Sequence, residues 1–218
     1  MKYKCLILDH DDTVVNSTAT IHHPAFLEAL KVLRPGVTIS LEDYFRENFH
    51  PGFTEYCTGK LGMTNEELDI EVGLWRDYVE KHVPNVYGGM KEIIERQKAE
   101  GGIVCVVSHS YDFNIKRDYA ANNLPEPDLI FGWECPPELR KPSTYALEQI
   151  AKRYDLAPSD MVMVDDLKPG IDMARAFGAF FAGAGWANDV VEIREFMKHN
   201  SDVYFTKVEE LATFLFDT

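Results

Sequence analysis

Asp9 and Asp11 are the first residues in this chain whose type and spacing indicate chemistry. They follow the apolar run 6–8 in the segment Leu-Ile-Leu-Asp-His-Asp-Asp-Thr-Val. Carboxylates clustered at the end of a buried strand repel one another and lose solvation, and a bound cation reverses that penalty. Side chains at i and i+2 of an extended chain point the same way. We therefore expect Asp9 and Asp11 to face a divalent metal or a phosphoryl group, with a simple acidic turn as the alternative for this segment alone.

Three further polar clusters occur where other predicted strands end. Ser108 follows Ile-Val-Cys-Val-Val, the pair Asp165-Asp166 follows Met-Val-Met-Val, and Lys141 opens the helix after the third predicted strand. Taken singly, Ser108 is an ordinary helix cap and Lys141 a solvated surface residue. In an open α/β sheet, however, ligands bind in the crevice outside the carboxyl ends of the strands. We therefore expect these four residues to line one crevice together with Asp9.

Short apolar runs alternate with helical patterns along most of the chain. This alternation predicts an α/β fold with a Rossmann-like, doubly wound parallel sheet. The expected strands are 3–8, 103–107, 129–131, 161–164, 179–182 and, more weakly, 203–205. The expected helices are 90–99, 114–122, 144–154, 170–177, 190–198 and 208–216.

Residues 17–84 break this alternation. They show helical periodicity at 23–33, 41–48 and 65–82, without a buried strand. Ser40 and Thr64 precede acidic residues in the pattern of helix N-caps. An insertion of this length is too long for a simple crossover. We therefore predict an α-helical cap domain at 17–84, inserted into a core domain made of residues 1–16 and 85–218.

The composition limits the classes of function. Of the 218 residues, 45% are hydrophobic and 12% aromatic, as expected for a globular protein. The formal net charge of −14, without a basic stripe, argues against nucleic acid and anionic membranes as partners. The four cysteines lack metal-ligand spacing, which is typical of a reduced compartment. No signal-peptide pattern and no apolar stretch of about 18 residues is found, so we expect a cytoplasmic protein. We also expect a monomer, which needs no special sequence feature.

The ordered set of motifs resembles the haloacid dehalogenase superfamily over residues 3–183. That family carries Asp-x-Asp-x-Thr after its first strand, a Ser or Thr after its second, a Lys often followed by Pro, and then an acidic pair. A helical insertion directly after the first motif resembles members with an α-helical cap, and the acidic pair resembles the branch containing β-phosphoglucomutase. The matching motifs are Asp9-His10-Asp11-Asp12-Thr13, Ser108, Lys141-Pro142 and Asp165-Asp166.

This resemblance implies Mg²⁺-dependent phosphoryl transfer. Asp9 is then the nucleophile that forms an aspartyl-phosphate, and Asp11 protonates the leaving group and later deprotonates the hydrolytic water. Ser108 donates a hydrogen bond to a phosphoryl oxygen, and Lys141 offsets the charge on Asp9 and the phosphate. Mg²⁺ prefers oxygen ligands, and those implied here are Asp9, the backbone carbonyl of Asp11, Asp166 and the neighbouring Asp165.

Two departures from the family pattern occur beside these motifs. Asp12 stands where a glycine is common. Gly170 stands where many relatives carry another aspartate, which the pair Asp165-Asp166 can supply. Dehalogenases of the family lack an acid at the position of Asp11, so its presence argues against carbon–halogen cleavage.

Substrate contacts are expected from His109 and Ser110, beside Ser108, and from the cap. His22 and His23 open the first predicted cap helix, near the offset at which mutase relatives carry a histidine that handles a substrate hydroxyl proton. We take His23 as the candidate substrate contact, with solvent exposure of both histidines as the alternative.

The sequence therefore predicts a Mg²⁺-dependent phosphatase acting on a small phosphorylated metabolite. A phosphosugar mutase of the β-phosphoglucomutase type, which passes the phosphoryl group to a second hydroxyl, is one alternative. A non-catalytic binding module that retains the fold is another.

Overall fold

One sheet of six parallel strands forms the centre of the computed structural model, which describes residues 1–217. The strands lie in the order β3-β2-β1-β4-β5-β6, with β1 paired to β2 on one side and to β4 on the other. This arrangement confirms the predicted doubly wound α/β fold. The strands are β1 (Cys5–Leu8), β2 (Ile103–Val107), β3 (Leu129–Phe131), β4 (Met161–Asp165), β5 (Phe180–Ala184) and β6 (Val203–Phe205).

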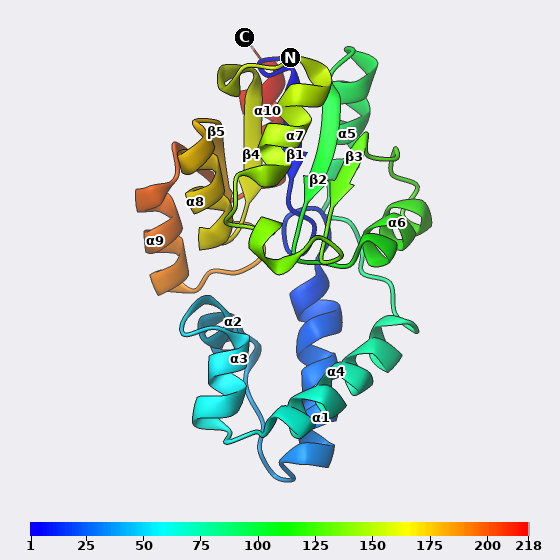
Figure 1. The fold of residues 1–218 in the computed structure, drawn as a ribbon, viewed down its shortest axis with the longest axis vertical. Coiled ribbons are helices and arrows are strands. Elements are labelled where there is room, and N and C mark those ends of the chain that lie inside the picture. The colour runs from blue at the N-terminus through cyan, green and yellow to red at the C-terminus, as the bar shows by residue number, and fades with distance from the viewer. Residues whose placement is uncertain (218) are drawn as a thin grey trace.

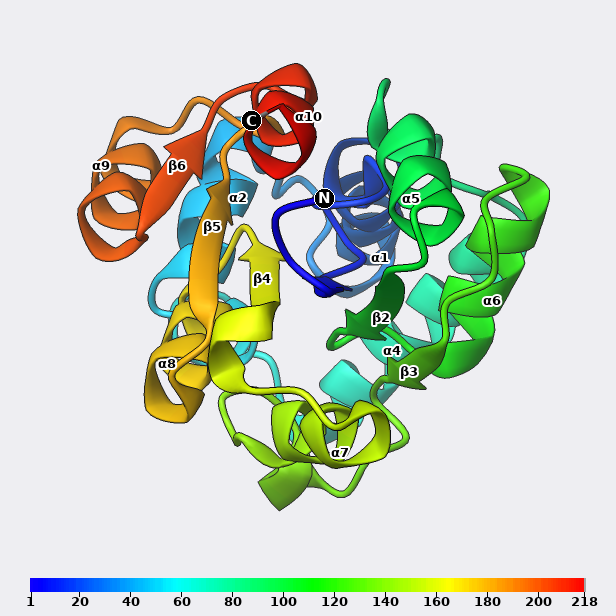
Figure 2. The same cartoon turned by 90° about the horizontal axis from the view of Figure 1, so that it is seen from above.

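Helices cover both faces of this sheet (Figure 2). In β1, Leu6 and Leu8 point into one apolar cluster, and Cys5 and Ile7 point into the other. The first cluster is closed by α5, α6 and α10, and the second by α7, α8 and α9. Because both faces are buried, the central strands are apolar throughout and not alternating. The helices are α5 (Met90–Ala99), α6 (Asp112–Ala121), α7 (Tyr145–Tyr154), α8 (Lys168–Phe177), α9 (Val191–Asn200) and α10 (Val208–Phe216).

Four helices between β1 and β2 lie together beyond the carboxyl ends of the strands (Figure 1). They have an apolar cluster of their own, in which Phe26 and Leu30 pack with Tyr44 and Tyr56. A separate cluster is what an inserted domain requires, and the boundaries at 17 and 84 stay a prediction. The helices are α1 (His23–Leu33), α2 (Leu41–Phe49), α3 (Phe53–Glu55) and α4 (Asn65–Val79), with π-helical turns at Thr18–His22 and Tyr56–Lys60.

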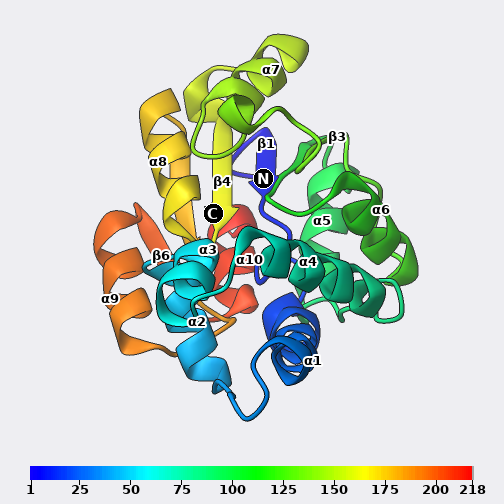
Figure 3. The same ribbon diagram turned by 60° about the horizontal axis from the view of Figure 1, so that its bottom comes forward.

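These four helices, which we call the cap, contact the core on two sides of the strand ends (Figure 3). On one side, Phe49 of α2 packs edge-on against Phe196 of α9, with 5.3 Å between ring centroids. On the other, Arg117 of α6 donates a 2.7 Å hydrogen bond to the carbonyl of Val79 in α4. The space between cap and core is therefore bounded on both sides.

The two segments that connect the cap to the core run side by side. The backbone N–H of Asn16 donates to the carbonyl of Asn85 at 2.9 Å, and that of Tyr87 donates to Val14 at 3.0 Å. The cap is thus held to the core by a short paired strap, which ends just before Gly88 and Gly89.

Element bounds differ from the predicted ranges in a few places. β1 begins at Cys5, β5 extends to Ala184, and α4 ends at Val79. The sequence pattern does not predict α3 and the π-helical turns, because Pro51 and Gly52 interrupt the periodicity just before α3. Within residues 1–217, none of the helices combines the length and apolar character that crossing a membrane requires.

Candidate active site

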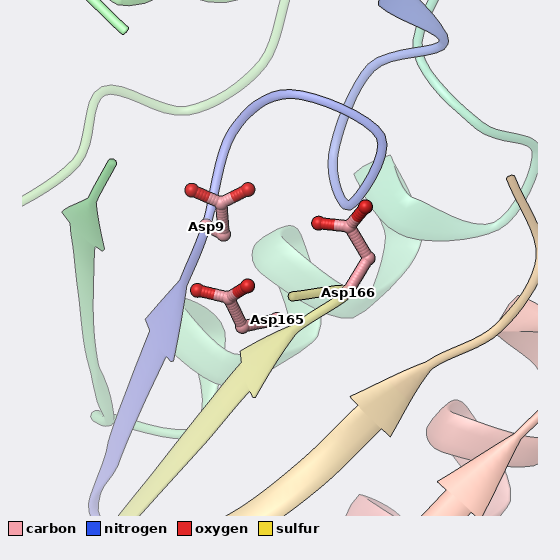
Figure 4. A group of neighbouring side chains, drawn as sticks. All are labelled: Asp9, Asp165 and Asp166. Carbon is pink, nitrogen blue, oxygen red and sulfur yellow. The ribbon is translucent and has the colours of Figure 1, made fainter. Parts of the chain in front are cut away.

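The site lies where the strand order changes direction, between β1 and β4. From β1 the chain adds β2 and β3 on one side, then crosses back to add β4 on the other. Such a switch point opens a crevice at the carboxyl ends of the strands. Asp9 follows β1, Asp165 ends β4, and Asp166 comes next (Figure 4). One carboxylate oxygen from each of these three residues lies within 4.8 Å of the other two.

Lys141 neutralises part of this charge from a loop that precedes α7. Its Nζ donates to Asp9 Oδ1 at 2.7 Å and to Asp165 Oδ2 at 2.6 Å. Lys141 is 8% exposed, and burial alone would lower its pKa, but Asp165 and Asp9 raise the pKa overall. The lysine is therefore a fixed cation held between Asp9 and Asp165.

Asp165 and Asp166 are adjacent but differ in what they contact. Asp165 uses both oxygens within the protein, because Oδ1 also accepts the N–H of Leu167 at 2.8 Å. Asp166 is buried, and its Oδ1 has no hydrogen-bond partner among residues 1–217. Burial and the nearby Asp12, Asp165 and Asp9 raise the pKa of Asp166 well above its usual value. An unpartnered buried carboxylate beside Asp9 is a good ligand for a hard cation such as Mg²⁺.

Asp11 contacts the cap through His22, which ends the first π-helical turn. His22 Nε2 lies 3.2 Å from Asp11 Oδ1, and the indole N–H of Trp75 donates to His22 Nδ1 at 3.0 Å. An indole can only donate, so Nδ1 is unprotonated and Nε2 carries the proton toward Asp11. Burial would lower the pKa of His22, and Asp11 raises it overall. The contacts with Trp75 and Asp11 together fix the orientation of the His22 ring.

This contact also affects Asp11. Burial favours the protonated form of Asp11, but the contacts with His22 more than offset this and lower its pKa. Asp11 is thus held in its ionised form, the form that can act as a base. To donate one, it needs the negative charge of a phosphate ester nearby, because a like charge raises the pKa of a carboxyl group.

The loop after β2 provides three more of the predicted residues. Ser108 is buried, and its Oγ accepts the backbone N–H of Ser110 at 3.1 Å, so its own proton is free for a ligand. His109 Nε2 lies 3.1 Å from the carbonyl of Lys141. Burial and the charge of Lys141 lower the pKa of His109, which makes it a neutral donor to that carbonyl. Ser108 and His109 line the same cavity as Asp9, and Ser110 lines the adjoining one.

His23 is placed elsewhere. Its Nε2 lies 2.9 Å from the carbonyl of Ile39, and its ring packs against Tyr44 within the cap. It does not line either cavity at the strand ends, whereas His22 lines both. The structure therefore places His22, and not the predicted His23, at these cavities, and a cap histidine as substrate contact stays a prediction. The π-helical turn that sets these positions has no clear sequence signature.

The family can now be assigned. The family model of haloacid dehalogenase-like hydrolases matches residues 3–178. The chain belongs to this family. It is an enzyme of the hydrolase class. Of the residues that match its motifs, Asp9, Ser108 and the pair Asp165-Asp166 lie at strand ends, and Lys141 reaches them from its loop. A comparison with curated protein sequences found no match.

Solved structures show the same fold at low sequence identity. A predicted phosphoglycolate phosphatase from Haemophilus somnus is 18% identical, with 98% of each chain covered and a TM-score of 0.76. A hydrolase of the family from Deinococcus radiodurans, solved with phosphate and sodium, is 17% identical, with 98% of this chain and 95% of that chain covered and a TM-score of 0.74. CbbY from Rhodobacter sphaeroides, solved with xylulose-1,5-bisphosphate, is 16% identical, with 96% of each chain covered and a TM-score of 0.71.

The two departures from the family pattern have a structural reason in this hydrolase. Asp12 has a φ of 58°, a left-handed conformation that glycine adopts freely and aspartate tolerates. Its Oδ1 accepts the N–H of Thr18 at 3.1 Å and so fixes the start of the π-helical turn that carries His22. A Cβ at Gly170 would overlap the carboxylate of Asp165, so the glycine makes room for Asp165 to reach Lys141.

Two connected cavities lie between the cap and the strand ends. The inner one, about 170 Å³, is lined by Asp9, Ser108, Lys141 and Asp166. The outer one, about 370 Å³, shares Asp11, His22, Asn48 and His109 with it. Its further lining residues include Glu71 and five aromatic side chains, Tyr44, Phe53, Trp75, Tyr111 and Trp133. Sequence reasoning missed Glu71 and Trp75, although their i, i+4 spacing places both on one face of α4.

A third cavity of about 500 Å³ lies away from these residues. It is lined by Tyr3, Ser159 and Arg175, at the opposite end of the strands. Its lining includes neither the acidic cluster nor Ser108 nor Lys141, so its larger volume does not make it a better candidate site.

We expect Mg²⁺ to stabilise this hydrolase through Asp166. Above the dissociation constant, each tenfold rise in free Mg²⁺ should add about 1.4 kcal/mol to the free energy of unfolding. The Asp166→Asn variant should lose this dependence, and Asp69→Asn, at an exposed position of α4, should keep it. Thermal unfolding over a Mg²⁺ series measures both. A full Mg²⁺ response in Asp166→Asn would contradict this assignment.

Glu71 should make stability depend on pH. Burial raises the pKa of Glu71 from 4.5 to about 7, so the folded protein holds this proton more tightly than the unfolded chain. The raised pKa of Glu71 therefore leaves the free energy of unfolding unchanged below about pH 4.5 and lowers it as the pH rises to 7. Relative to the native chain, Glu71→Gln should gain about 1–3 kcal/mol between about pH 5 and pH 8. Urea unfolding at pH values of about 5 and 8 measures this gain, with exposed Glu80→Gln as the control. If the free energy of unfolding of Glu71→Gln differs from that of the native chain by the same amount at both pH values, the prediction is refuted.

Proposed function

We propose that this hydrolase is a Mg²⁺-dependent phosphatase that acts on a small phosphorylated metabolite through an aspartyl-phosphate at Asp9. The observation that carries the proposal is the position of Lys141. Its ammonium group lies 2.7 Å from Asp9 and 2.6 Å from Asp165, while Asp166 keeps an unpartnered oxygen beside them. An ionised, fixed and partly neutralised carboxylate is what attack on a phosphoryl group requires.

The reaction begins with the carboxylate of Asp9. It attacks phosphorus while the bond from phosphorus to the ester oxygen breaks. Lys141 offsets the charge of Asp9 and of the incoming phosphoryl oxygens, which otherwise repel each other. The Ser108 hydroxyl, whose proton is free, donates to one of those oxygens. Losing one such donor typically lowers the rate by about 10²–10³-fold.

Asp11 handles the protons in both half-reactions. It gives a proton to the departing alcohol oxygen, and it takes one from the water that hydrolyses the aspartyl-phosphate. His22 holds Asp11 in place through the bond to Asp11 Oδ1, and Trp75 in turn fixes the tautomer of His22. The cap therefore orients the acid–base residue that comes from the core.

The residues present suit Mg²⁺, which would be held by the carboxylates of Asp9 and Asp166 with the backbone carbonyl of Asp11. When bound, Mg²⁺ supplies positive charge to the phosphoryl oxygens and to the acidic cluster. Asp165 serves this group indirectly, because both of its oxygens already accept hydrogen bonds, one from Lys141 and one from the backbone N–H of Leu167.

The size of the site favours small substrates. The inner cavity of about 170 Å³ suits a phosphoryl group, and the outer cavity of about 370 Å³ suits a small leaving group. The cap covers both and limits access of bulk water during the attack on phosphorus.

A phosphosugar mutase is the second candidate, and His22 is the observation that favours it. This histidine lines both cavities and contacts Asp11, so it can also reach a substrate hydroxyl. A mutase would return the phosphoryl group from Asp9 to that hydroxyl in place of water.

We expect phosphate release from small phosphate monoesters that requires Mg²⁺ and stops with EDTA. The Asp9→Asn variant should lower the rate by at least about 10³-fold, because it removes the nucleophile but keeps the side-chain shape. Exposed Asp69→Asn should keep the native rate. The measurement is phosphate release over a panel of esters.

The same panel separates the alternatives. Interconversion of phosphosugar isomers without phosphate release would replace the phosphatase with a mutase. Full activity of Asp9→Asn, or activity unaffected by EDTA, would reject the proposed mechanism.

A further inference from the structure

The outer cavity has a wall of aromatic rings around one buried acid. Trp75 of α4, Tyr111 and Trp133 form a connected group, with ring centroids 6.1 Å apart for Trp75 and Tyr111 and 6.4 Å for Tyr111 and Trp133. Tyr44 and Phe53 approach from the rest of the cap, 6.3 Å apart. Aromatic faces attract cations through the ring quadrupole, within about 6 Å of the centroid.

Glu71 is the acid in this wall. It is 4% exposed and lines the outer cavity, and none of residues 1–217 forms a hydrogen bond or ion pair with it, although the charge of His22 acts on it from the same cavity. A buried carboxylate without a partner is costly, and burial accordingly raises its pKa to about 7. A cation bound beside it would restore its charge and remove that cost. Glu71 is not used by the proposed phosphoryl transfer, so its burial in the leaving-group cavity needs another reason.

No lysine or arginine is among the described residues that line the outer cavity. The arginines closest to its aromatic wall are engaged with the rings themselves. Arg140 lies 3.9 Å from the Trp133 ring centroid, and Arg76 lies 5.7 Å from that of Tyr111 and donates to its hydroxyl. In the inner cavity, Lys141 is already paired twice. A leaving group with a carboxylate or second phosphate would therefore meet the carboxylates of Glu71 and Asp11 with no lysine or arginine lining the cavity beside them.

We propose that the outer cavity binds an ammonium group of the leaving alcohol, and hence that the substrate is the phosphate monoester of an amino alcohol. The ammonium lies against the faces of Trp75 and its aromatic neighbours and pairs with Glu71. This inference rests on the proposed phosphatase function and specifies its substrate class. In the overall reaction, water adds to phosphorus, the phosphorus–oxygen ester bond breaks, and the products are inorganic phosphate and the protonated amino alcohol.

The decisive comparison uses two esters of the same shape that differ in charge. Phosphocholine carries a trimethylammonium group, and 3,3-dimethylbutyl phosphate carries a neutral tert-butyl group in its place. We expect kcat/KM for phosphocholine to exceed that of the neutral ester by about 10-fold or more, from cation–π attraction and the carboxylate together. In Glu71→Gln this ratio should fall toward one, and in exposed Glu80→Gln it should stay at the native value.

Three outcomes on the same panel overturn the inference and leave the phosphatase intact. The first is equal kcat/KM for the two isosteric esters. The second is a preference for phosphoglycolate, which would show that the cavity accepts an anion. The third is faster hydrolysis of glycerol phosphate than of phosphocholine, which would make Glu71 a hydrogen-bonding group for hydroxyls.

Binding of the free alcohols keeps the inference testable if no ester is hydrolysed and the phosphatase proposal fails. Trp75 and Trp133 line the cavity, so their fluorescence reports occupancy. Choline should bind more tightly than 3,3-dimethylbutanol, and Glu71→Gln should reduce that difference. Equal or weaker binding of choline would overturn the assignment of this cavity to a cation.

Discussion

The paired contacts of Lys141 are the interaction on which the rest of the site depends. Five aspartates gather at one crevice, and Lys141 is the one buried ammonium among the described residues that contacts any of them, through Asp9 and Asp165. The five are Asp9, Asp11, Asp12, Asp165 and Asp166. Removing one member of a buried ion pair costs about 3–5 kcal/mol, because the remaining charge loses both water and partner. The same contacts that offset the charge of the acidic cluster also hold the carboxylate of Asp9 in place, so Lys141 affects both the stability of the site and its chemistry.

The topology of the sheet brings this group together. Asp9 and the pair Asp165-Asp166 follow adjacent strands, β1 and β4, on the two sides of the switch point. Ser108 follows β2, the other neighbour of β1. The cap then adds what the core lacks. Through His22 it contacts Asp11, and through Glu71 and Trp75 it lines the outer cavity, whose aromatic residues Tyr111 and Trp133 come from the core.

Much of this could be predicted from the sequence, and for a physical reason. Buried parallel strands are continuous apolar runs, and the polar residues that end them mark the crevice, so Asp9, Ser108 and Asp166 could be located without coordinates. The different contacts of Asp165 and Asp166 could not be predicted in this way. Whether Asp165 or Asp166 keeps a free oxygen depends on the loop of Lys141 and on the room left by Gly170. The cap residue that faces the site was harder still to predict, because a π-helical turn determines that His22 and not His23 faces Asp11. The positions of Glu71 and Trp75 depend on how α4 packs over the core, which no local pattern encodes.

The central claim is that Asp9 carries the phosphoryl group during turnover. The most direct test is to stop the reaction with acid while a substrate is being consumed and to analyse the digested protein by mass spectrometry. We predict that the peptide containing Asp9 gains one HPO₃ group, which is lost on treatment with hydroxylamine, as expected for an acyl phosphate. Turnover with no such adduct at Asp9, or with the adduct on another residue, would contradict this account.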